Sequence, residues 1–183
     1  MSLTQLDANA ALIVVDLQHG VVNLPLIEPA APIVERSAKL ARAFRASGRP
    51  VVLVNVDAGA PGRTDMGHRP LPSDPEFSRL VPELEQAPTD HLVTKKRWGA
   101  FQTTDLDNWL RGKGVEQVVI VGIATSIGVE STARFASELG YHVVLVTDAM
   151  TDLDAGTHEN SLAKVFPRLG ETTTTDDLLA RIG

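Results

Sequence analysis

The chain has 183 residues, of which 43% are hydrophobic and 22% charged, a composition typical of one globular domain with a real core. Its formal net charge of −6 disfavours nucleic acid and anionic membranes as partners, because both attract basic surfaces. The absence of cysteine excludes disulfides, thiolate metal sites and a cysteine nucleophile. Since no basic leader precedes a long apolar run, we expect a cytoplasmic protein.

Buried parallel strands are predicted where apolar residues run continuously instead of alternating with polar ones. In chain order these segments are Ala11 to Asp16, Val51 to Val56, His91 to Lys95, Val118 to Gly122, His142 to Thr147 and Glu171 to Thr173. Helical spacing is found between and after them, in Pro32 to Ser47, Thr104 to Lys113, Ile127 to Leu139, Ala155 to Val165 and Thr175 to Ile182. This alternation predicts a single three-layer α/β/α, Rossmann-like domain over residues 1–183, with a mostly parallel sheet of about six strands.

A segment rich in proline and glycine interrupts the pattern between residues 57 and 88. A loop of this length inside a compact domain is usually a lid or a binding loop, or else it is disordered. Arg63 and Arg69 in this segment are candidate clamps for a substrate carboxylate, because guanidinium binds carboxylate through two hydrogen bonds. A solvated arginine is the alternative for each.

Ligands of open α/β sheets bind beyond the carboxyl ends of the strands. The polar residues there are Asp16, Asn55, Asp57, Lys95, Asp148 and the turn Ala124-Thr125-Ser126-Ile127-Gly128. Any of them could instead cap the following turn, and this is the interpretation we favour for Asp148 and Asp152. Asp16 and Lys95 are the strongest candidates for chemistry, because each ends a strand with apolar neighbours.

Four motifs carry a resemblance to a known family: IVVDLQ (13–18), KKRWGAF (95–101), TDL (104–106) and GIATSIGVESTAR (122–134). The chain resembles the isochorismatase-like hydrolase superfamily. In most members an Asp, a Lys and a Cys are catalytic; the first two match Asp16 and Lys95, and the cysteine position is Gly128. This departure argues against amide hydrolysis through a thioester. The resemblance also implies a non-proline cis peptide at Ile123–Ala124 and a homo-oligomer.

Isochorismatases carry glycine at the same position and cleave a vinyl ether without a nucleophilic side chain. The resemblance therefore implies that Asp16 donates a proton to a small carboxylated substrate beside Lys95, with Gly128 widening the pocket and giving access to backbone amides. The predicted substrate contacts are Gln18, Arg63, Trp98, Ala124, Thr125 and Ser126. No cofactor is expected. No metal is expected either, because VDAGAPGRTD after the second strand lacks the Asp-x-His motif of nicotinamidases.

Other interpretations stay open. Ala124 to Gly128 also reads A-x-S-x-G, so Ser126 could be a nucleophile with Asp148 or Asp152 and His158. Direct attack of water on a small amide is a further possibility. A binding or assembly protein is another, with the small residues of 131–139 facing a second subunit. His19 could contact substrate or lie in an exposed turn, and Trp98, with Arg97, could border the pocket or belong to the core.

Overall fold

The computed structural model describes residues 3–67, 71–72 and 74–182. Within them, six strands form one parallel sheet in the order β3-β2-β1-β4-β5-β6. The strands are β1 (Ala10–Val15), β2 (Val51–Val56), β3 (His91–Lys95), β4 (Gln117–Ile123), β5 (His142–Thr151) and β6 (Glu171–Thr173). The predicted single α/β domain with a parallel sheet is confirmed.

The order of the strands reverses between β1 and β4. From β1 the chain builds β2 and β3 on one side of the sheet, and it then returns to place β4, β5 and β6 on the other side. The carboxyl ends of β1 and β4 are therefore neighbours, with Val15 paired to Gly122. In doubly wound sheets such a switch point opens a crevice for ligands.

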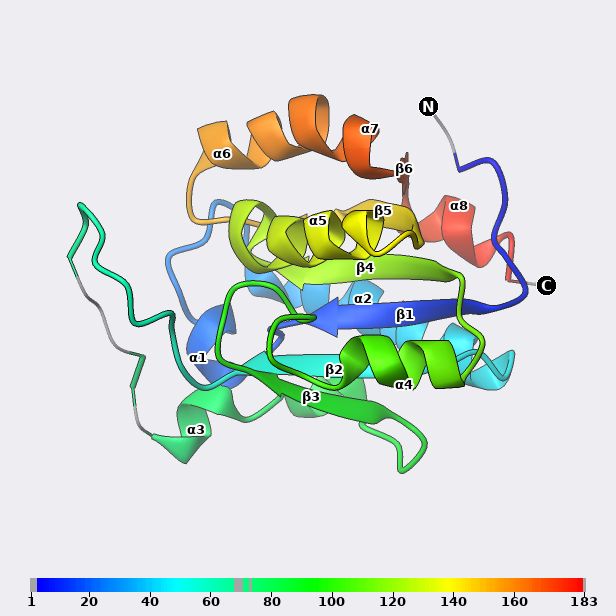
Figure 1. Cartoon of the computed structure of the whole chain (residues 1–183), viewed down its shortest axis with the longest axis horizontal. Helices are drawn as coiled ribbons and strands as arrows, with labels where there is room; N and C mark the ends of the chain where they lie inside the picture. Colours follow the sequence, from blue (N-terminus) through cyan, green and yellow to red (C-terminus); the bar gives the residue numbers. More distant parts are fainter. Residues whose placement is uncertain (1–2, 68–70, 73, 183) are drawn as a thin grey trace.

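Helices cover both faces of the sheet and give three layers (Figure 1). The helices α2 (Ala30–Ala46) and α8 (Thr175–Leu179) pack on one face, and α4 (Leu106–Gly112), α5 (Glu130–Glu138) and α7 (Phe166–Leu169) pack on the other. Alternate residues of β1 point to opposite faces: Leu12 and Val14 join the core under α2, while Ile13 and Val15 join the core under α5. The sheet is buried on both sides, which explains its continuous apolar runs.

The predicted helix of residues 155–165 does not end before Pro167. Helix α6 (Ala155–Asn160) passes into a π-helical turn, η3 (Ser161–Val165), and then into α7, where Pro167 occupies the first turn. A second π-helical turn, η2 (Thr125–Val129), precedes α5 where one continuous helix from Ile127 was predicted.

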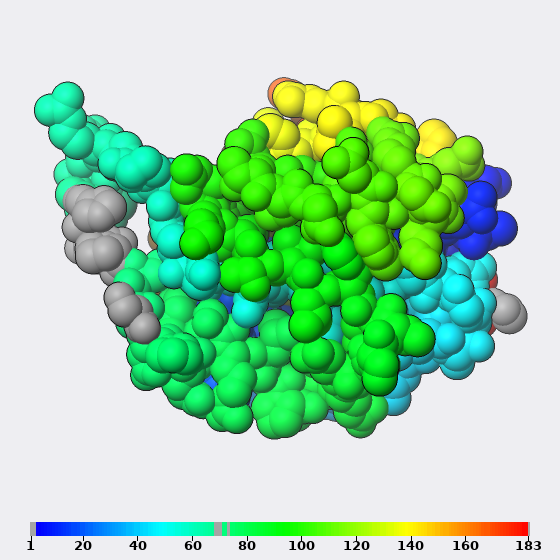
Figure 2. All heavy atoms as spheres, turned by 60° about the horizontal axis from the view of Figure 1, so that its bottom comes forward, coloured from blue at the N-terminus to red at the C-terminus, as the bar shows by residue number. Residues whose placement is uncertain are grey.

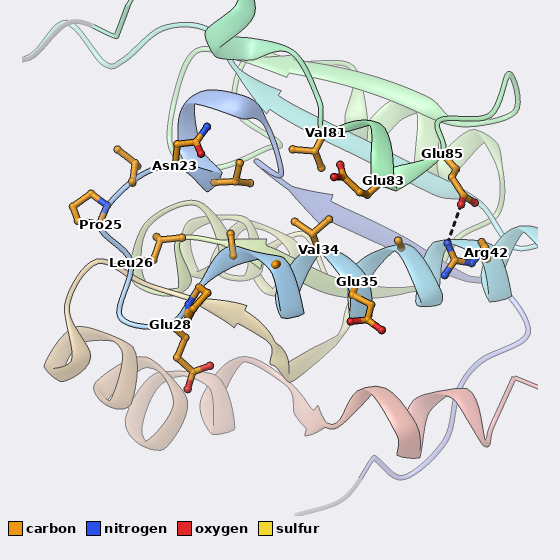
Figure 3. Close-up of a pocket in the computed structure, with 16 residues that line it drawn as sticks. Asn23, Pro25, Leu26, Glu28, Val34, Glu35, Arg42, Val81, Glu83 and Glu85 are labelled. Carbon is orange, nitrogen blue, oxygen red and sulfur yellow. Dashed lines mark hydrogen bonds and ion pairs between the residues drawn. The ribbon is translucent and has the colours of Figure 1, made fainter.

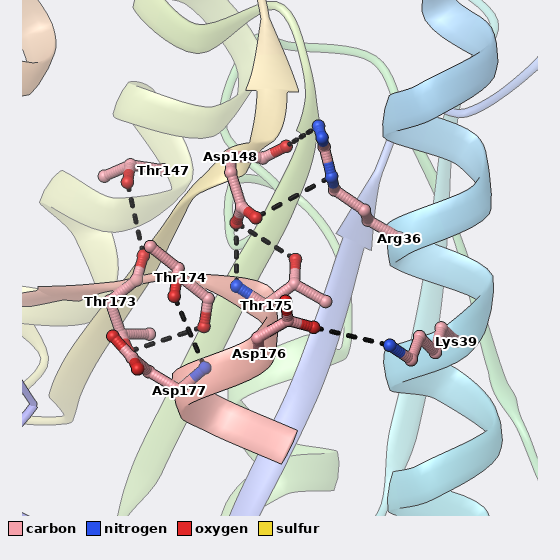
Figure 4. A network of polar contacts seen from close by, with 9 residues as sticks. All are labelled: Arg36, Lys39, Thr147, Asp148, Thr173, Thr174, Thr175, Asp176 and Asp177. Atoms are coloured by element: carbon pink, nitrogen blue, oxygen red, sulfur yellow. Dashed lines mark hydrogen bonds and ion pairs between the residues drawn. The ribbon is translucent and has the colours of Figure 1, made fainter. Parts of the chain in front are cut away.

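Strand β5 is longer than predicted and contains a bulge. Its pairing with β4 jumps from Ile120–Leu145 to Gly122–Met150, so β5 uses five residues where β4 uses two. Asp148 lies in this bulge and not in a turn after the strand. Its Oδ1 accepts hydrogen bonds from the backbone amide and the hydroxyl of Thr175, and its backbone oxygen accepts one from Arg36 (Figure 4). Asp148 thus joins β5 to α8 and α2.

The excursion between β2 and β3 contains short helices, α3 (Pro75–Ser78) and η1 (Pro82–Leu84). Its first part, up to residue 67, extends away from the body of the molecule (Figures 1 and 2). The returning chain lies beside α1 (His19–Val22), where Val81 donates a backbone hydrogen bond to Leu17 at 3.1 Å. Arg69 lies outside the described residues. Nowhere in the described part is there a helix with the length and apolarity needed to cross a membrane.

Candidate active site

Asp16 and Lys95 form a buried ion pair at the carboxyl ends of β1 and β3. Lys95 Nζ donates to Asp16 Oδ2 at 2.7 Å and to the backbone oxygen of Arg97 at 3.2 Å. Only 5% of Asp16 and 2% of Lys95 are exposed. Asp16 has a φ of 53°, a left-handed conformation that side chains other than glycine adopt rarely and that is found often at functional sites.

The pKa of Asp16 is raised from 3.8 to about 6, because burial penalises the charged carboxylate more than the ammonium of Lys95 stabilises it. The proton of the neutral acid belongs on Oδ1, since Oδ2 already accepts from Lys95. Oδ1 has no hydrogen-bond partner in the described part of the chain. The site can therefore present an acidic proton close to neutral pH.

A cavity of about 450 Å³ opens over this pair. Asp16, Lys95 and Arg63 are its charged lining residues among those described, and most of its wall is apolar. The apolar contributors are Val21, Leu24, Val56, Ala58, Ala60, Met66, Leu71, Trp98, Ile123, Ala124, Ile127 and Leu153. A volume of this size and a few convergent polar groups are typical of small-molecule sites.

Gly128 lies against the acid. A Cβ atom built at this position would stand 3.0 Å from Asp16 Oδ2 and 3.1 Å from Val15 Cγ1. Any side chain there would press on the carboxyl group, so glycine leaves this corner of the cavity open. The peptide bond Ile123–Ala124 is cis, which confirms the implied cis peptide.

The turn before Gly128 is held by its own set of hydrogen bonds. The amide of Ser126 donates to Asp152 Oδ2 at 2.6 Å, and the amides of Ile127 and Val129 both donate to the backbone oxygen of Ala124. These amides have partners within the chain, so they are not the free donors that the sequence led us to expect at this helix start.

The geometry does not assemble a serine triad. His158 Nδ1 lies 2.9 Å from Thr125 Oγ1, whose hydroxyl also bonds the backbone oxygen of Thr151 at 3.1 Å. The carboxylate of Asp152 accepts from the amides of Ser126 and Leu153, and Asp148 is used by α8. Thr125 and Ser126 are not among the described residues that line the cavity, whereas Ala124 is.

The other predicted contacts divide into two groups. Arg63 and Trp98 line the cavity, and Trp98 is 62% exposed, so it is not a core residue. Gln18 is fully buried and binds the backbone: its amide nitrogen donates to the carbonyls of Val56 and Phe77, and its oxygen accepts from the Val56 amide. Gln18 therefore fixes β2 and the returning loop beside Asp16 instead of lining the cavity.

Further candidates at the strand ends are also used within the fold. Asn55 donates to the backbone oxygen of Ser78 at 2.7 Å, and Asp57 lies 3.9 Å from Lys96. His19 lies 3.5 Å from Glu76 and does not line the cavity. On α5, Ala133 and Ala136 are buried in this chain's own core and do not face outward.

The apolar walls Val21, Leu24 and Leu153 were not anticipated. The first two follow Gln18 by a few residues, so proximity in sequence to Asp16 is the signal that could have indicated them. In the described ranges, no three His, Asp or Glu side chains lie together in a way that could hold a metal ion.

The fold is a doubly wound parallel sheet in which a buried acid at the switch point is paired with an ammonium from β3 beneath a loop excursion, and this defines a single-domain α/β protein with a candidate reaction site. The isochorismatase domain matches residues 10–177, and the chain belongs to the isochorismatase family. It is 40% identical over 182 residues to YwoC, an uncharacterised isochorismatase family protein of Bacillus subtilis (strain 168), covering 94% of this chain and 93% of that protein.

Two further proteins show the breadth of the family. Ureidoacrylate amidohydrolase RutB of Variovorax paradoxus (strain S110) is 29% identical over 203 residues, covering 94% of this chain and 81% of RutB. The structure of an isochorismatase family protein from Burkholderia thailandensis superimposes with a TM-score of 0.94 at 40% identity, covering 97% of each chain. The protein is thus a hydrolase of the isochorismatase family.

Proposed function

We propose that this hydrolase cleaves a small carboxylated vinyl ether, such as isochorismate, by proton donation from Asp16. The observation that carries the proposal is the raised pKa of Asp16, about 6, in a cavity wall where no side chain stands between the acid and Gly128. A general acid is most effective when its pKa lies near the working pH.

In the proposed reaction, Lys95 holds Oδ2 of Asp16 and the proton on Oδ1 passes to the terminal vinyl carbon of the substrate. The ether oxygen stabilises the resulting cation, and water adds to the cationic carbon. This water returns a proton to the Asp16 carboxylate. The hemiketal then breaks the bond between its central carbon and the ether oxygen; that oxygen stays on the ring and takes up the proton of the hemiketal hydroxyl, which gives pyruvate and a dihydroxy acid. No nucleophilic side chain is required, in agreement with the glycine at 128.

Recognition of the substrate is assigned to Arg63 and the apolar wall. Besides Lys95, which is bonded to Asp16, Arg63 is the cationic residue among the described ones that line the cavity. A guanidinium binds a carboxylate through two parallel hydrogen bonds. Trp98 and Ile127 would pack against the ring of the substrate, while Gln18 keeps the loop in position from behind.

Amide hydrolysis is the second candidate, because RutB is named an amidohydrolase. The present chain has no cysteine, so Asp16 would have to act as a base that activates water. A base must be ionised and an acid protonated, so the two candidates predict opposite dependences of rate on pH around the pKa of Asp16.

The test offers isochorismate and a panel of small amides to the purified wild type and to Asp16→Asn, with pyruvate and ammonia measured separately. We expect pyruvate from the wild type and a loss of about 100-fold or more in the variant. Asp57→Asn is the matched control, since Asp57 lies outside the cavity lining and should leave the rate unchanged.

Ammonia without pyruvate would favour the amide reaction, and an Asp16→Asn variant as fast as the wild type would exclude both schemes. Absence of turnover on every compound would contradict both proposed reactions. The homo-oligomer implied by the family stays a prediction. Sedimentation equilibrium, which measures the mass of the assembly in solution, tests it.

A further inference from the structure

A groove separate from the candidate active site runs along α2. It has a volume of about 910 Å³ and lies between α2, the loop of residues 22–30 and the segment around η1 (Figure 3). Its floor is apolar, with Val34 and Val81 each 7% exposed and Leu26 half-buried. This volume is at the upper end for small-molecule pockets, so a larger guest fits the groove better.

The shape of the groove suits a helix. The α2 residues that line it fall on one stripe, from Ala30 and Ala31 through Val34 and Ala38 to Arg42. Twelve residues of helix rise about 18 Å, which equals three to four turns of a guest lying alongside. The alanines in this stripe allow a second helix to approach closely, in the manner of other helix-in-groove interactions.

The rim of the groove is acidic on both sides. Glu28 and Glu35 flank it on the α2 side, and Glu83 and Glu85 on the η1 side (Figure 3). Arg42 forms an ion pair with Glu85 at 3.2 Å. The other three carboxylates have no basic partner within 4.0 Å in the part of the chain described, so they are available to a guest.

A second copy packed groove to groove would place these carboxylates against themselves, and the whole chain carries a net charge of −6. We propose instead that the groove is a docking site for a basic amphipathic helix of another protein. Its apolar stripe would cover Val34, Ala38 and Val81, and lysine or arginine on either side of the stripe would meet the acidic rim.

The groove shares a wall with the candidate active site. Leu24 lines both cavities, and the loop that carries it is tied to the site by the amide of Ile27, which donates to the backbone oxygen of Asp152 at 2.8 Å. A helix in the groove would therefore contact the loop that closes one side of the cavity over Asp16. The docking site itself does not depend on the function proposed for that cavity.

The test uses a fluorescein-labelled peptide of about 14 residues, long enough to span the groove as a helix, with leucine on one helical face and lysine on both flanks. Fluorescence anisotropy measures its binding to the full-length protein. We expect saturable binding that weakens with salt, and a loss of about tenfold in the double variant Glu35→Lys, Glu83→Lys.

The control variant Glu138→Lys, Glu159→Lys changes the net charge equally at exposed glutamates outside the groove, and it should bind within about twofold of the wild type. A scrambled peptide without an apolar face should not bind. Equal weakening in both double variants, or no saturable binding at low salt, would overturn the proposal. So would a dimer of this chain that the Glu35→Lys, Glu83→Lys variant dissociates, because a second copy would then occupy the groove.

Discussion

Lys95 Nζ lies 2.7 Å from Asp16 Oδ2, yet the pKa of Asp16 is raised and not lowered. An ion pair normally stabilises the carboxylate, so a pKa of about 6 means that the effect of burial outweighs that of the ammonium. Lys95 keeps the pKa of Asp16 from rising further. Because its ammonium occupies Oδ2, the proton of the neutral acid is on Oδ1. The two residues are separated by 79 positions in the chain and meet because β1 and β3 end at the same edge of the sheet.

The first prediction concerns the rate. If protonated Asp16 is the donor, kcat/KM for the vinyl ether falls as pH rises through about 6. The measurement is a pH profile between about 4.5 and 8.5 that follows pyruvate. A rate that rises through the same interval would instead show that the ionised carboxylate is needed.

The second prediction concerns stability and its sign. Folding raises the pKa of Asp16 from 3.8 to about 6, so the folded state holds a proton that the unfolded chain releases. The contribution of Asp16 to the free energy of unfolding is full below pH 3.8 and is lost as pH rises through about 6. Urea unfolding of the wild type and of Asp16→Asn at pH 4 and pH 7 measures this effect. The free energy of unfolding of the wild type, relative to that of Asp16→Asn, should be smaller at pH 7 than at pH 4.

The third prediction concerns the stability of variants that remove one or both members of the Asp16–Lys95 ion pair. Lys95→Met leaves an unpaired buried carboxyl, and Asp16→Asn leaves an unpaired buried ammonium; each should cost about 3 kcal/mol when the remaining partner stays charged. The double variant removes both charges and should be more stable than either single variant. Asparagine is suitable at position 16 because it tolerates the positive φ. A double variant less stable than both single ones contradicts this account.

The fourth prediction concerns Gly128. In Gly128→Ala the added Cβ meets Asp16 Oδ2 at 3.0 Å, so the carboxyl must move away from Lys95 or the turn must shift. We expect kcat to fall by about tenfold or more, while the free energy of unfolding decreases by only about 1–3 kcal/mol. Gly112→Ala is the control, because its Cβ would have nothing within 4 Å and it lies in α4.

The fifth prediction concerns Gly122, which has a φ of +124° and lies against β1. A Cβ there would stand 2.0 Å from the backbone oxygen of Val15, and backbone cannot yield as a flexible side chain does. We expect Gly122→Ala to lose more than about 4 kcal/mol or to fail to fold. Thermal unfolding beside Gly112→Ala checks this, and near-equal midpoints for the two variants would refute it.

The sheet could be predicted because its signal is local. Continuous apolar runs identify strands that are covered on both faces, and this holds for β1, β2 and β4. The end of β5 could not be predicted in this way. Thr147 and Asp148 interrupt the apolar run, and only the pairing with β4 and the contacts of Asp148 with α8 show that the strand continues past them.

The candidate site could be predicted in part for the same kind of reason. Asp16 and Lys95 end strands that sequence identifies, so the topology alone brings them together. Gln18 was predicted to contact substrate, but three backbone groups from β2 and the distant loop use its amide, and no local pattern reveals such a long-range set of bonds. The hydrogen-bond partners of the Ser126 and Ile127 amides could not be predicted from the sequence either. The first is the distant side chain of Asp152, and the second follows from the π-helical form of η2.

The bulge in β5 has a consequence for the C-terminal end of the chain. Within the bulge, Asp148 accepts two hydrogen bonds from Thr175 of α8. Three residues further on, the carbonyl of Thr151 accepts a hydrogen bond from the hydroxyl of Thr125. Removing the last helix would take from Asp148 its two hydrogen bonds with Thr175 and leave its contacts with Arg36. The bulge would then be held less firmly, and so would Thr151 and the turn that it anchors beside the cavity. Truncating the C-terminus, or fusing a tag that displaces α8, is therefore expected to alter the turn of residues 124–128 beside Asp16.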